Sequence, residues 1–598
     1  MKQESETSGA GAFVAAPRRA LLATARSAAL ARGAEALCAL LLCVMSINLL
    51  TVVARKSITV DEVVMIPSAY YHLVAGNFQL VHEHPPLSKI LAAVPLLFIQ
   101  PRELDSRRTG APPASPAEEW AYQEHFWQDN RAAFETISFW TRVPMIALAV
   151  ALGVLVFAFA RELFGPRAAV LAVALYSFEP TVLAHARVVQ TDIPAAFGYL
   201  LLFYALHRYV PAPSMKRARA LGLAGGVAVL AKFSMLIAGP VLAATFLWML
   251  WRAPRRGQSR AALAAHASVA ALALFLIIHA TYFFHSRELL DVDARWVADA
   301  FRENSGAVWD AVRALSYIFP TDFVLGVFWQ ISHNGAGHPA SLLGMHSHTG
   351  WWYYFPVAFA LKTTLPFLLL SLASLAWSGY ELFVRRDRRF IVLLAPFALY
   401  TAFVLLSRID IGVRYYLPAF PFLFILGGAL LDRLLNSGRA RRGAWAATFV
   451  LLAWVGVEAL RAYPNQMSYM NQLAWSHPHW HYLSDSNVEW GDDVRGLAEY
   501  LKARGETRVR AATLGGYATL QYYGIESLDL IAPTDVRLPE TRYVAIGASF
   551  LNGSTVPARE LRGRKLTEEE RINFFDEYRR RTPEAVIGGS TYIFREHE

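Results

Sequence analysis

The stretch SITVDEVVMIPSAYYHLVAG, residues 57–76, places an Asp-Glu pair directly after the first apolar segment of the chain. Charge is costly beside a membrane, so a carboxylate there indicates either a structural role or a group that takes part in proton transfer. Thr59 and Glu62 have the spacing of a capping box, which gives Glu62 a structural role. Asp61 is then left free to act as a base, although an Asp in a first helical turn can equally cap the helix itself.

A second acidic group, Asp192 in HARVVQTDIPAAF, stands where another apolar segment begins on the same predicted side. The sequence TDIP is also a good helix start, which favours a capping role for Asp192 taken alone. Between the two carboxylates, HEHPPLSK carries Lys89 behind a stiff Pro-Pro turn. Lys89 can snorkel to lipid phosphates or hold one particular phosphate, and its spacing does not decide between these two roles.

Further cations are predicted at the same level. AKFSML places Lys232 between two short apolar runs, and SRIDIGVRYYLPAFPFL places Arg408 and Arg414 at an outer turn. The donors of arginine form a fixed fork that suits an anionic phosphate. Lys362 in GWWYYFPVAFALKTTLP is expected about ten residues into its span, roughly 15 Å deep at 1.5 Å per residue. A cation at that depth indicates a functional site, with pairing to a neighbouring helix as the structural alternative.

The segment SHNGAGHPASLLGMHSHTGWWYY holds four histidines, which are His333, His338, His346 and His348. Imidazole is the commonest metal ligand, but this spacing matches no strong zinc motif. A divalent metal is therefore the less favoured interpretation, and we predict no metal ligand and no required cofactor. The two cysteines, Cys38 and Cys43, lie inside the first apolar segment, which excludes a disulfide framework and a cysteine-based zinc site.

The elements that must position these residues are membrane helices. The chain of 598 residues is 55% hydrophobic and 17% charged, far more apolar than a soluble protein of this length. Its net charge of +10 comes mainly from short basic loops, a pattern that encodes membrane topology rather than nucleic-acid binding. Runs long enough to cross about 30 Å of hydrocarbon predict about eleven spans. They are 34–53, 137–160, 168–186, 192–210, 217–231, 234–251, 261–284, 352–375, 389–406, 413–431 and 444–461.

The basic loops also predict the orientation of the spans. Residues 1–33 are expected to form a flexible cytoplasmic tail, so the short Arg-rich loops fall on the same side. The loop 54–136, the loop 285–351 and the C-terminal segment then share the outer side. The piece LSKILAAVPLLFI, residues 87–99, is too short to span and is placed in the interface.

The C-terminal segment differs from the rest of the chain in its pattern of apolar and polar residues. DDVRGLAEYLKARG has helical spacing of apolar residues, while RVRAATL, RYVAIGASF and STYIFR have the composition of short strands. We therefore predict a membrane domain over 34–461 and a small α/β domain over 462–598.

Taken in order, the Asp-Glu pair, HPPLSK, HAR…TD, AKFS, GWWYYFPVAFALKT and RYYLPAFPFL resemble the protein O-mannosyltransferase and aminoarabinose transferase superfamily. These are polytopic glycosyltransferases of the GT-C class that use polyprenyl-phosphate sugars. The resemblance covers roughly residues 35–431, and DSNVEWGDD (485–493) is similar to the start of the tail domain in bacterial relatives. It implies a mainly α polytopic membrane fold with interfacial helices in the first outer loop.

The resemblance also implies roles for individual residues. Asp61 corresponds to the catalytic carboxylate, and Asp192 to the second acidic residue of the site. The implied contacts to the donor phosphate are Lys89, Arg414, Lys232 and Lys362. The residues given supporting roles are Glu62, His84 and His185. The family does not generally need a catalytic metal.

The expected reaction is therefore the transfer of a sugar from a polyprenyl-phosphate donor to an acceptor hydroxyl, with inversion and with Asp61 as base. The acceptor is a protein, a lipid or a glycan, membrane lipids are the other partners, and no nucleic acid is involved. The expected location is a bacterial inner membrane, with the site and the C-terminal domain in the periplasm. A lipid-linked sugar flippase or secondary transporter is the alternative, which the depth predicted for Lys362 favours.

Overall fold

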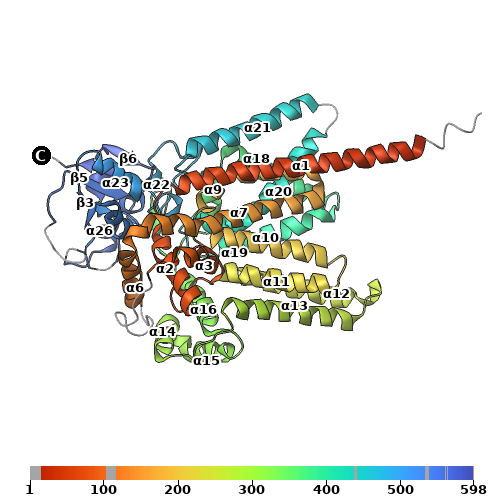
Figure 1. The fold of residues 1–598 in the computed structure, drawn as a ribbon, viewed down its shortest axis with the longest axis horizontal. Coiled ribbons are helices and arrows are strands. Elements are labelled where there is room, and N and C mark those ends of the chain that lie inside the picture. The colour runs from red at the N-terminus through yellow and green to blue at the C-terminus, as the bar shows by residue number, and fades with distance from the viewer. Residues whose placement is uncertain are drawn as a thin grey trace, which may run out of the picture.

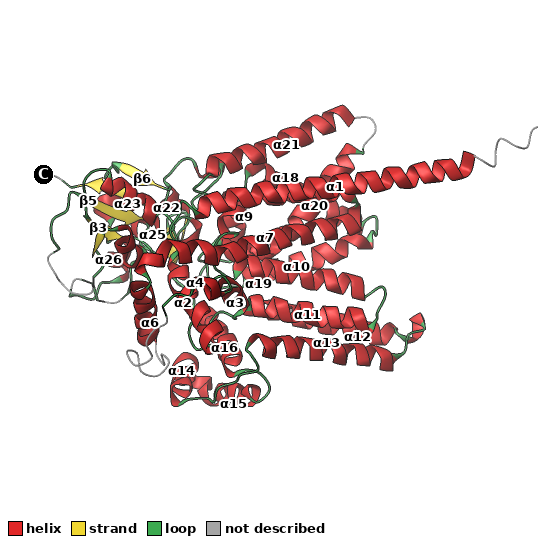
Figure 2. Cartoon of the chain, viewed as in Figure 1, coloured by secondary structure: helices red, strands yellow, loops and turns green. Residues whose placement is uncertain are grey.

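The computed structural model describes residues 15–102, 116–436, 441–532, 538–558, 560, 561 and 563–596. Over these residues, long helices form a bundle with a small sheet domain at one end (Figures 1 and 2). The predicted flexible tail 1–33 lies outside the described residues as far as residue 14. From Ala15 onward it is helical, because helix α1 (Ala15–Val53) extends well before the first apolar run.

Eight helices in the described part of the chain are long and apolar enough to cross a membrane. They run side by side along the length of the molecule (Figure 1). These helices are α1, α7 (Phe134–Phe164), α12 (Gly239–Arg252), α13 (Arg260–Thr281), α18 (Leu365–Phe383), α19 (Ile391–Leu405), α20 (Phe420–Leu435) and α21 (Arg441–Ala462). The prediction of a multi-pass, mainly helical membrane protein is confirmed.

Three of the eleven predicted spans are not among these eight. The run 168–186 is divided at Glu179 and Pro180 into α8 (Pro166–Phe178) and α9 (Pro180–His185). The other two are α10 (Asp192–Tyr209) and α11 (Met215–Ala231), whose ends carry charged residues. These helices pack against α7, α13 and α20 in the bundle. Helix α10 is largely buried there, whereas Met215 and Leu223 of α11 are exposed, so the crossing of the membrane by these helices stays a prediction.

The segment 352–375, predicted as one span, is broken in the structure. Helix α17 (Tyr354–Lys362) ends at Lys362, and α18 begins three residues later, at Leu365, with Pro366 in its first turn. Pro366 has no backbone N–H to continue a helix from the preceding residues. The prediction of one unbroken span through Lys362 is therefore wrong.

The long connections after α1 and after α13 lie at the end of the bundle that carries the sheet domain (Figure 1). After α1 come α2 (Val60–Ala75), α3 (Leu87–Ala93), α4 (Leu96–Ile99) and α6 (Pro116–Asp129). After α13 come α14 (Asp291–Phe301), α15 (Ser305–Ser316), α16 (Thr321–Ala336) and an antiparallel hairpin of β1 (Ala340–Leu342) and β2 (Met345–Ser347). The apolar segment 87–99 forms α3 and α4 and, as predicted, is too short to span a membrane.

The tail forms a five-stranded mixed sheet in the order β4-β3-β5-β7-β6. Its strands are β3 (Arg508–Ala512), β4 (Glu526–Asp529), β5 (Tyr543–Gly547), β6 (Ala585–Ile587) and β7 (Thr591–Arg595). Strand β3 pairs in parallel with β4 and β5, and β7 pairs antiparallel with β5 and β6. Three of the strands lie in the three predicted segments, so the predicted α/β character of the tail is confirmed, whereas β4 and β6 were not predicted.

Helix α23 (Val494–Lys502) covers the sheet with the predicted apolar residues Val494, Leu497, Ala498 and Leu501, all of them buried. Helical spacing places these four side chains on one face, which packs in a cluster with Val509 of β3. The remaining short helices of the tail are α22 (His479–Tyr482), α24 (Gly516–Thr519), α25 (Ala548–Leu551), α26 (Glu568–Ile572) and α27 (Asp576–Arg579).

Candidate active site

Asp61 is held at the start of α2 by a local motif that does not use its own side chain. Thr59 is the N-cap, and its hydroxyl and backbone N–H bond reciprocally with Glu62, so the predicted capping box is present. The Asp61 side chain is 28% exposed. It accepts a hydrogen bond of 2.6 Å from Nε2 of Gln190 and one of 3.1 Å from Nη1 of Arg414. The alternative in which Asp61 caps the helix is therefore excluded.

Asp192 lies beside the same arginine. It is the first residue of α10, and its Oδ1 accepts a hydrogen bond of 2.7 Å from the ammonium of Lys232. Its Oδ2 is 3.6 Å from Nη1 of Arg414. One guanidinium thus lies between carboxylates that are far apart in the sequence. The structure brings together Asp61, Asp192, Lys232 and Arg414, as the predicted topology required.

Aromatic rings lie against these cations. The ammonium of Lys232 is 4.0 Å from the ring centre of Tyr415, and the Arg414 guanidinium carbon is 4.2 Å from that of Trp490. Arg414 and Tyr415 belong to the 3-10 helix Val413–Ala419 that precedes α20, whereas Trp490 comes from the tail. Rings that contact a cation face-on stabilise it and restrict its position.

His84, in the loop before α3, and Lys89, in the first turn of α3, approach the cluster from the first outer connection. The ammonium of Lys89 is buried and donates a hydrogen bond of 2.7 Å to the carbonyl oxygen of Val81, so this lysine does not snorkel to lipid. Burial, with the positive charges of Lys89 and Lys232 nearby, holds the pKa of His84 well below its usual value. His84 is therefore a neutral imidazole at pH 7 and can accept or donate a hydrogen bond.

Four buried polar atoms around the cluster have no hydrogen-bond partner among the described residues. They are Nε of Arg414, Oδ2 of Asp192, Nδ1 of His84 and Nδ1 of His185. Buried polar groups are nearly always paired, so unpaired donors and acceptors at one place indicate a site that binds a polar ligand. The cluster can contact an anion through its cations while the exposed carboxylate of Asp61 accepts a proton.

Lys362 lies elsewhere in the structure. Its ammonium donates hydrogen bonds to the carbonyl oxygens of Met467, at 2.7 Å, and of Asn487. Within the described residues, Lys362 forms no ion pair with Asp61 or Asp192. It joins the end of α17 to the tail instead of lining the acidic pair.

The four histidines of the loop before α17 contact different partners. His346 bonds the carbonyl oxygen of Asn552 at 2.5 Å, and His348 lies 3.0 Å from Glu568. The rings of His333 and His338 pack 5.8 Å apart. In the part of the chain that the structure describes, no three His, Cys, Asp or Glu side chains are grouped so that they could hold a metal ion.

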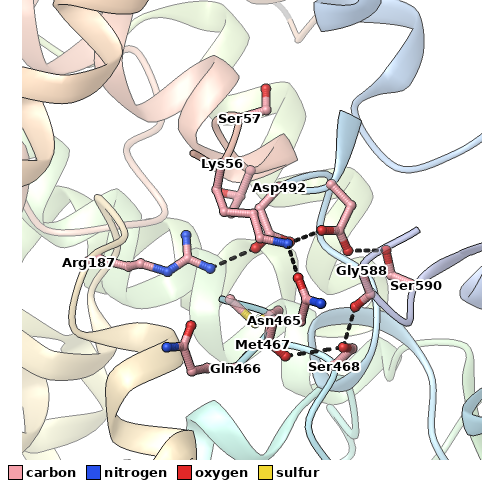
Figure 3. A network of polar contacts seen from close by, with 12 residues as sticks. Lys56, Ser57, Arg187, Asn465, Gln466, Met467, Ser468, Asp492, Gly588 and Ser590 are labelled. Carbon is pink, nitrogen blue, oxygen red and sulfur yellow. Dashed lines mark hydrogen bonds and ion pairs between the residues drawn. The ribbon is translucent and has the colours of Figure 1, made fainter. Parts of the chain in front are cut away.

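Three residues of the site region were not predicted from the sequence. Arg142 of α7 forms a buried ion pair with Glu62, Gln190 bonds Asp61, and Arg187 bonds Asp492 at 2.6 Å (Figure 3). A signal for Arg142 was present, because a single arginine inside an apolar run implies an acidic partner. Gln190 and Arg187 lie in a short turn of ordinary polarity that carries no such signal.

The described residues thus form a multi-pass helical membrane protein with carboxylates and cations gathered at one place. Residues 133–282 match the sequence profile of the family described as dolichyl-phosphate-mannose-protein mannosyltransferase. The resemblance is thereby confirmed, and the chain is identified as a membrane glycosyltransferase. No curated protein sequence matches the chain.

Three solved structures illustrate the likeness. ArnT from Cupriavidus metallidurans bound to undecaprenyl phosphate is 17% identical over 81% of this chain and 75% of its own, with a TM-score of 0.45. The Pmt1-Pmt2 protein O-mannosyltransferase complex of S. cerevisiae bound to the sugar donor is 13% identical over 72% and 90%, with a TM-score of 0.49. The apo oligosaccharyltransferase of Archaeoglobus fulgidus is 15% identical over 82% and 64%, with a TM-score of 0.42.

Proposed function

We propose that this protein transfers a sugar from a polyprenyl-phosphate donor to a hydroxyl group of an acceptor. The observation that carries the proposal is the position of Arg414 between Asp61 and Asp192, with Lys232 bonded to Asp192. A sugar phosphate needs positive charge where the leaving phosphate becomes a stronger anion, and the acceptor hydroxyl needs a base. The match to a family of lipid-phosphate-dependent mannosyltransferases supports the same donor class.

In the proposed reaction the acceptor oxygen bonds to the anomeric carbon while the bond from that carbon to the phosphate oxygen breaks. The hydroxyl proton passes to the carboxylate of Asp61, and the electron pair of the broken bond stays on the polyprenyl phosphate. Arg414, through its unpaired Nε, and Lys232 stabilise the developing negative charge. One direct displacement inverts the configuration of the anomeric carbon.

Asp192 has a different role in this proposal. It is bonded to Lys232 and lies next to Arg414, so it holds both cations in place rather than accepting the proton. Asp61 is the better base because its side chain is 28% exposed, whereas that of Asp192 is 2% exposed. A base must reach the hydroxyl that it deprotonates.

We further propose that the reaction takes place on the periplasmic side of a bacterial inner membrane. The outer loops, the candidate site and the tail lie at one end of the bundle, while the short Arg-rich loops are at the other (Figure 1). Positive loops stay on the cytoplasmic side. The acceptor is a protein, a lipid or a glycan, and the chemistry requires no metal.

The test is sugar transfer by the purified full-length chain, supplied with undecaprenyl-phosphate sugars and candidate acceptors. Asp61→Asn and Asp61→Ala should lower the rate by roughly 10²- to 10⁴-fold, the usual contribution of a catalytic base. Asp310→Asn, an acid 70% exposed and paired with Arg313 on α15, serves as the control and should transfer normally. Normal transfer by both Asp61 variants would refute the mechanism. Movement of the donor across a bilayer without transfer would support a flippase instead.

A further inference from the structure

The segment DSNVEWGDD, residues 485–493, joins the tail to the candidate site. We propose that this segment is a positioning element of the donor site and that Trp490 is its central positioning residue, fixing both the base and the phosphate-binding arginine. The inference rests on the proposed function. It assigns the tail a part in catalysis, since the segment bonds to the backbone directly before Asp61 and directly before Arg414.

Trp490 contacts Arg414 through its ring and Val60, the residue before Asp61, through its backbone. Its ring, 1% exposed, lies 4.2 Å from the guanidinium carbon of Arg414. Its carbonyl oxygen accepts a hydrogen bond of 2.8 Å from the backbone N–H of Val60, the residue directly before Asp61. One residue therefore sets the separation between the carboxylate and the arginine that it faces.

The neighbours of Trp490 hold the chain on both sides of the site. The side-chain oxygen of Asn487 accepts a bond of 2.8 Å from the backbone N–H of Val413, the residue directly before Arg414. The hydroxyl of Ser486 donates to the carbonyl oxygen of Ile411 at 2.7 Å. On the other side, the carbonyl oxygen of Asp492 accepts from the N–H of Ser57 at 3.0 Å. The segment thus fixes the backbone before Asp61 and before Arg414.

The side chain of Asp492 fixes a third segment of the chain at the site. It forms a buried ion pair of 2.6 Å with Arg187, as Figure 3 shows. Arg187 belongs to the short turn between α9 and α10, which also carries Gln190, the hydrogen-bond donor to Asp61, and ends at Asp192. The parts of the chain that carry Asp61, Asp192 and Arg414 are therefore each bonded to the segment 485–493.

Glu489 anchors the segment in the tail. Its carboxyl group is buried and accepts hydrogen bonds from the backbone N–H groups of Leu514, at 2.7 Å, and Ser549, at 2.9 Å, which follow strands β3 and β5. Neighbouring residues of one segment thus bond to the sheet and to the site. This arrangement makes the folded tail a rigid support for the catalytic groups.

The experiment measures the affinity of the purified full-length protein for two lipids, undecaprenyl phosphate and the uncharged undecaprenol. Trp490→Leu keeps an apolar side chain but removes the ring beneath Arg414. It should weaken binding of undecaprenyl phosphate by about 3- to 30-fold, the range for a desolvated cation–π contact. Binding of undecaprenol should not change, because this lipid carries no phosphate for the arginine to bind. General structural damage would weaken both lipids alike.

Trp490→Tyr and Trp490→Phe keep a ring and should restore most of the affinity for undecaprenyl phosphate, with Phe the weaker of the two. This graded series tests the proposal even where Trp490→Leu fails to fold. Trp475→Leu is the matched control, because Trp475 forms an exposed pair with Arg461 at 5.5 Å on the same tail. It should leave both affinities unchanged.

Arg414→Ala separates the two proposals. If it lowers the affinity for undecaprenyl phosphate while Trp490→Leu does not, the positioning role is refuted and the proposed function stands. If Arg414→Ala binds both lipids as the wild type does, the proposed donor site itself is refuted. In the Arg414→Ala background, Trp490→Leu should cause no further loss of affinity that is specific to the phosphate, as expected of a residue that acts through the arginine.

Discussion

Asp61 and Glu62 are neighbours in the sequence, yet Glu62 forms a fully buried ion pair and Asp61 a partly exposed one. Glu62 is fully buried and accepts bonds from Arg142, Thr59 and the backbone of Val189. Arg142 in turn donates to Glu62 and to the carbonyl oxygens of Lys56 and Ser57. Neither side chain keeps an unpaired polar atom within the described residues.

In the cluster around Asp61, by contrast, some buried polar atoms have no hydrogen-bond partner among the described residues. Arg414 keeps an unpaired Nε, Asp192 an unpaired Oδ2, and the Asp61 side chain is partly exposed. A fully bonded buried pair has no capacity left for a ligand, so it serves to hold the fold. An incompletely bonded pair costs stability and is retained where it binds something. The degree of hydrogen-bond satisfaction therefore separates the structural pair from the candidate catalytic one.

The largest expected effect is on the structural pair. Glu62→Ala leaves the guanidinium of Arg142 buried without its counter-charge, and we expect a loss of about 3–5 kcal/mol in the free energy of unfolding. Denaturation of the purified protein in detergent measures this loss. Glu135→Ala on α7, where the acid is 56% exposed and paired with Arg495, is the control and should cost less than about 1 kcal/mol. Equal stability of the two variants would contradict the assignment of Glu62 to the fold.

A smaller effect, and one on activity alone, is expected at the other cluster. Arg414→Lys keeps the positive charge but loses the fork that reaches Asp61 and Asp192 together. We expect kcat/KM for sugar transfer to fall about 10- to 100-fold, with the free energy of unfolding changed by less than about 1 kcal/mol.

The control for this prediction is Arg433→Lys. Arg433 is 45% exposed and pairs with Glu381 near the end of α20, so its substitution should alter neither activity nor stability. Unfolding of Arg414→Lys would mean that this arginine, like Arg142, holds the fold.

The local signals in the sequence predicted local structure well. The capping box at Thr59 and Glu62, the apolar face of α23 and three of the five tail strands follow from spacing within a few residues. Charge asymmetry between loops predicted that Asp61, Asp192, Lys232 and Arg414 would share one face, because it is a property of the whole chain. These predictions needed no knowledge of which helices touch.

Predictions that depend on tertiary contacts were wrong or were not made. Lys362 was assigned a depth on the assumption of one unbroken span, but the helix ends there and the tail supplies its acceptors. Helices α8, α10 and α11 were predicted as spans but are not among the eight candidates of the described chain, so their membrane crossing stays a prediction. The contact of Trp490 with Arg414 joins residues 76 positions apart, and no spacing rule reaches that far.

The smallest expected effect concerns Asp410, a carboxylate that is buried like Glu62 but incompletely hydrogen-bonded like the carboxylates of the candidate site. It is buried in the loop before Arg414, and its Oδ2 accepts one hydrogen bond of 2.7 Å from the backbone N–H of Trp351. Its Oδ1 has no partner among the described residues. Burial raises the pKa of Asp410 to about 7, against the lowering effect of the bond from Trp351.

The raised pKa of Asp410 predicts how stability depends on pH. Between about pH 4 and pH 7 the carboxyl group loses its proton in the unfolded chain but keeps it in the folded protein, so its contribution to stability falls as the pH rises. Asp410→Asn keeps an acceptor for Trp351 and does not titrate. We expect the drop in Tm between pH 6 and pH 7 to be smaller in this variant, by an amount equivalent to about 1 kcal/mol. If the drop in Tm is unchanged, Asp410 is ionised in the folded protein and paired as completely as Glu62. Its hydrogen bonding would then not be intermediate between the two clusters.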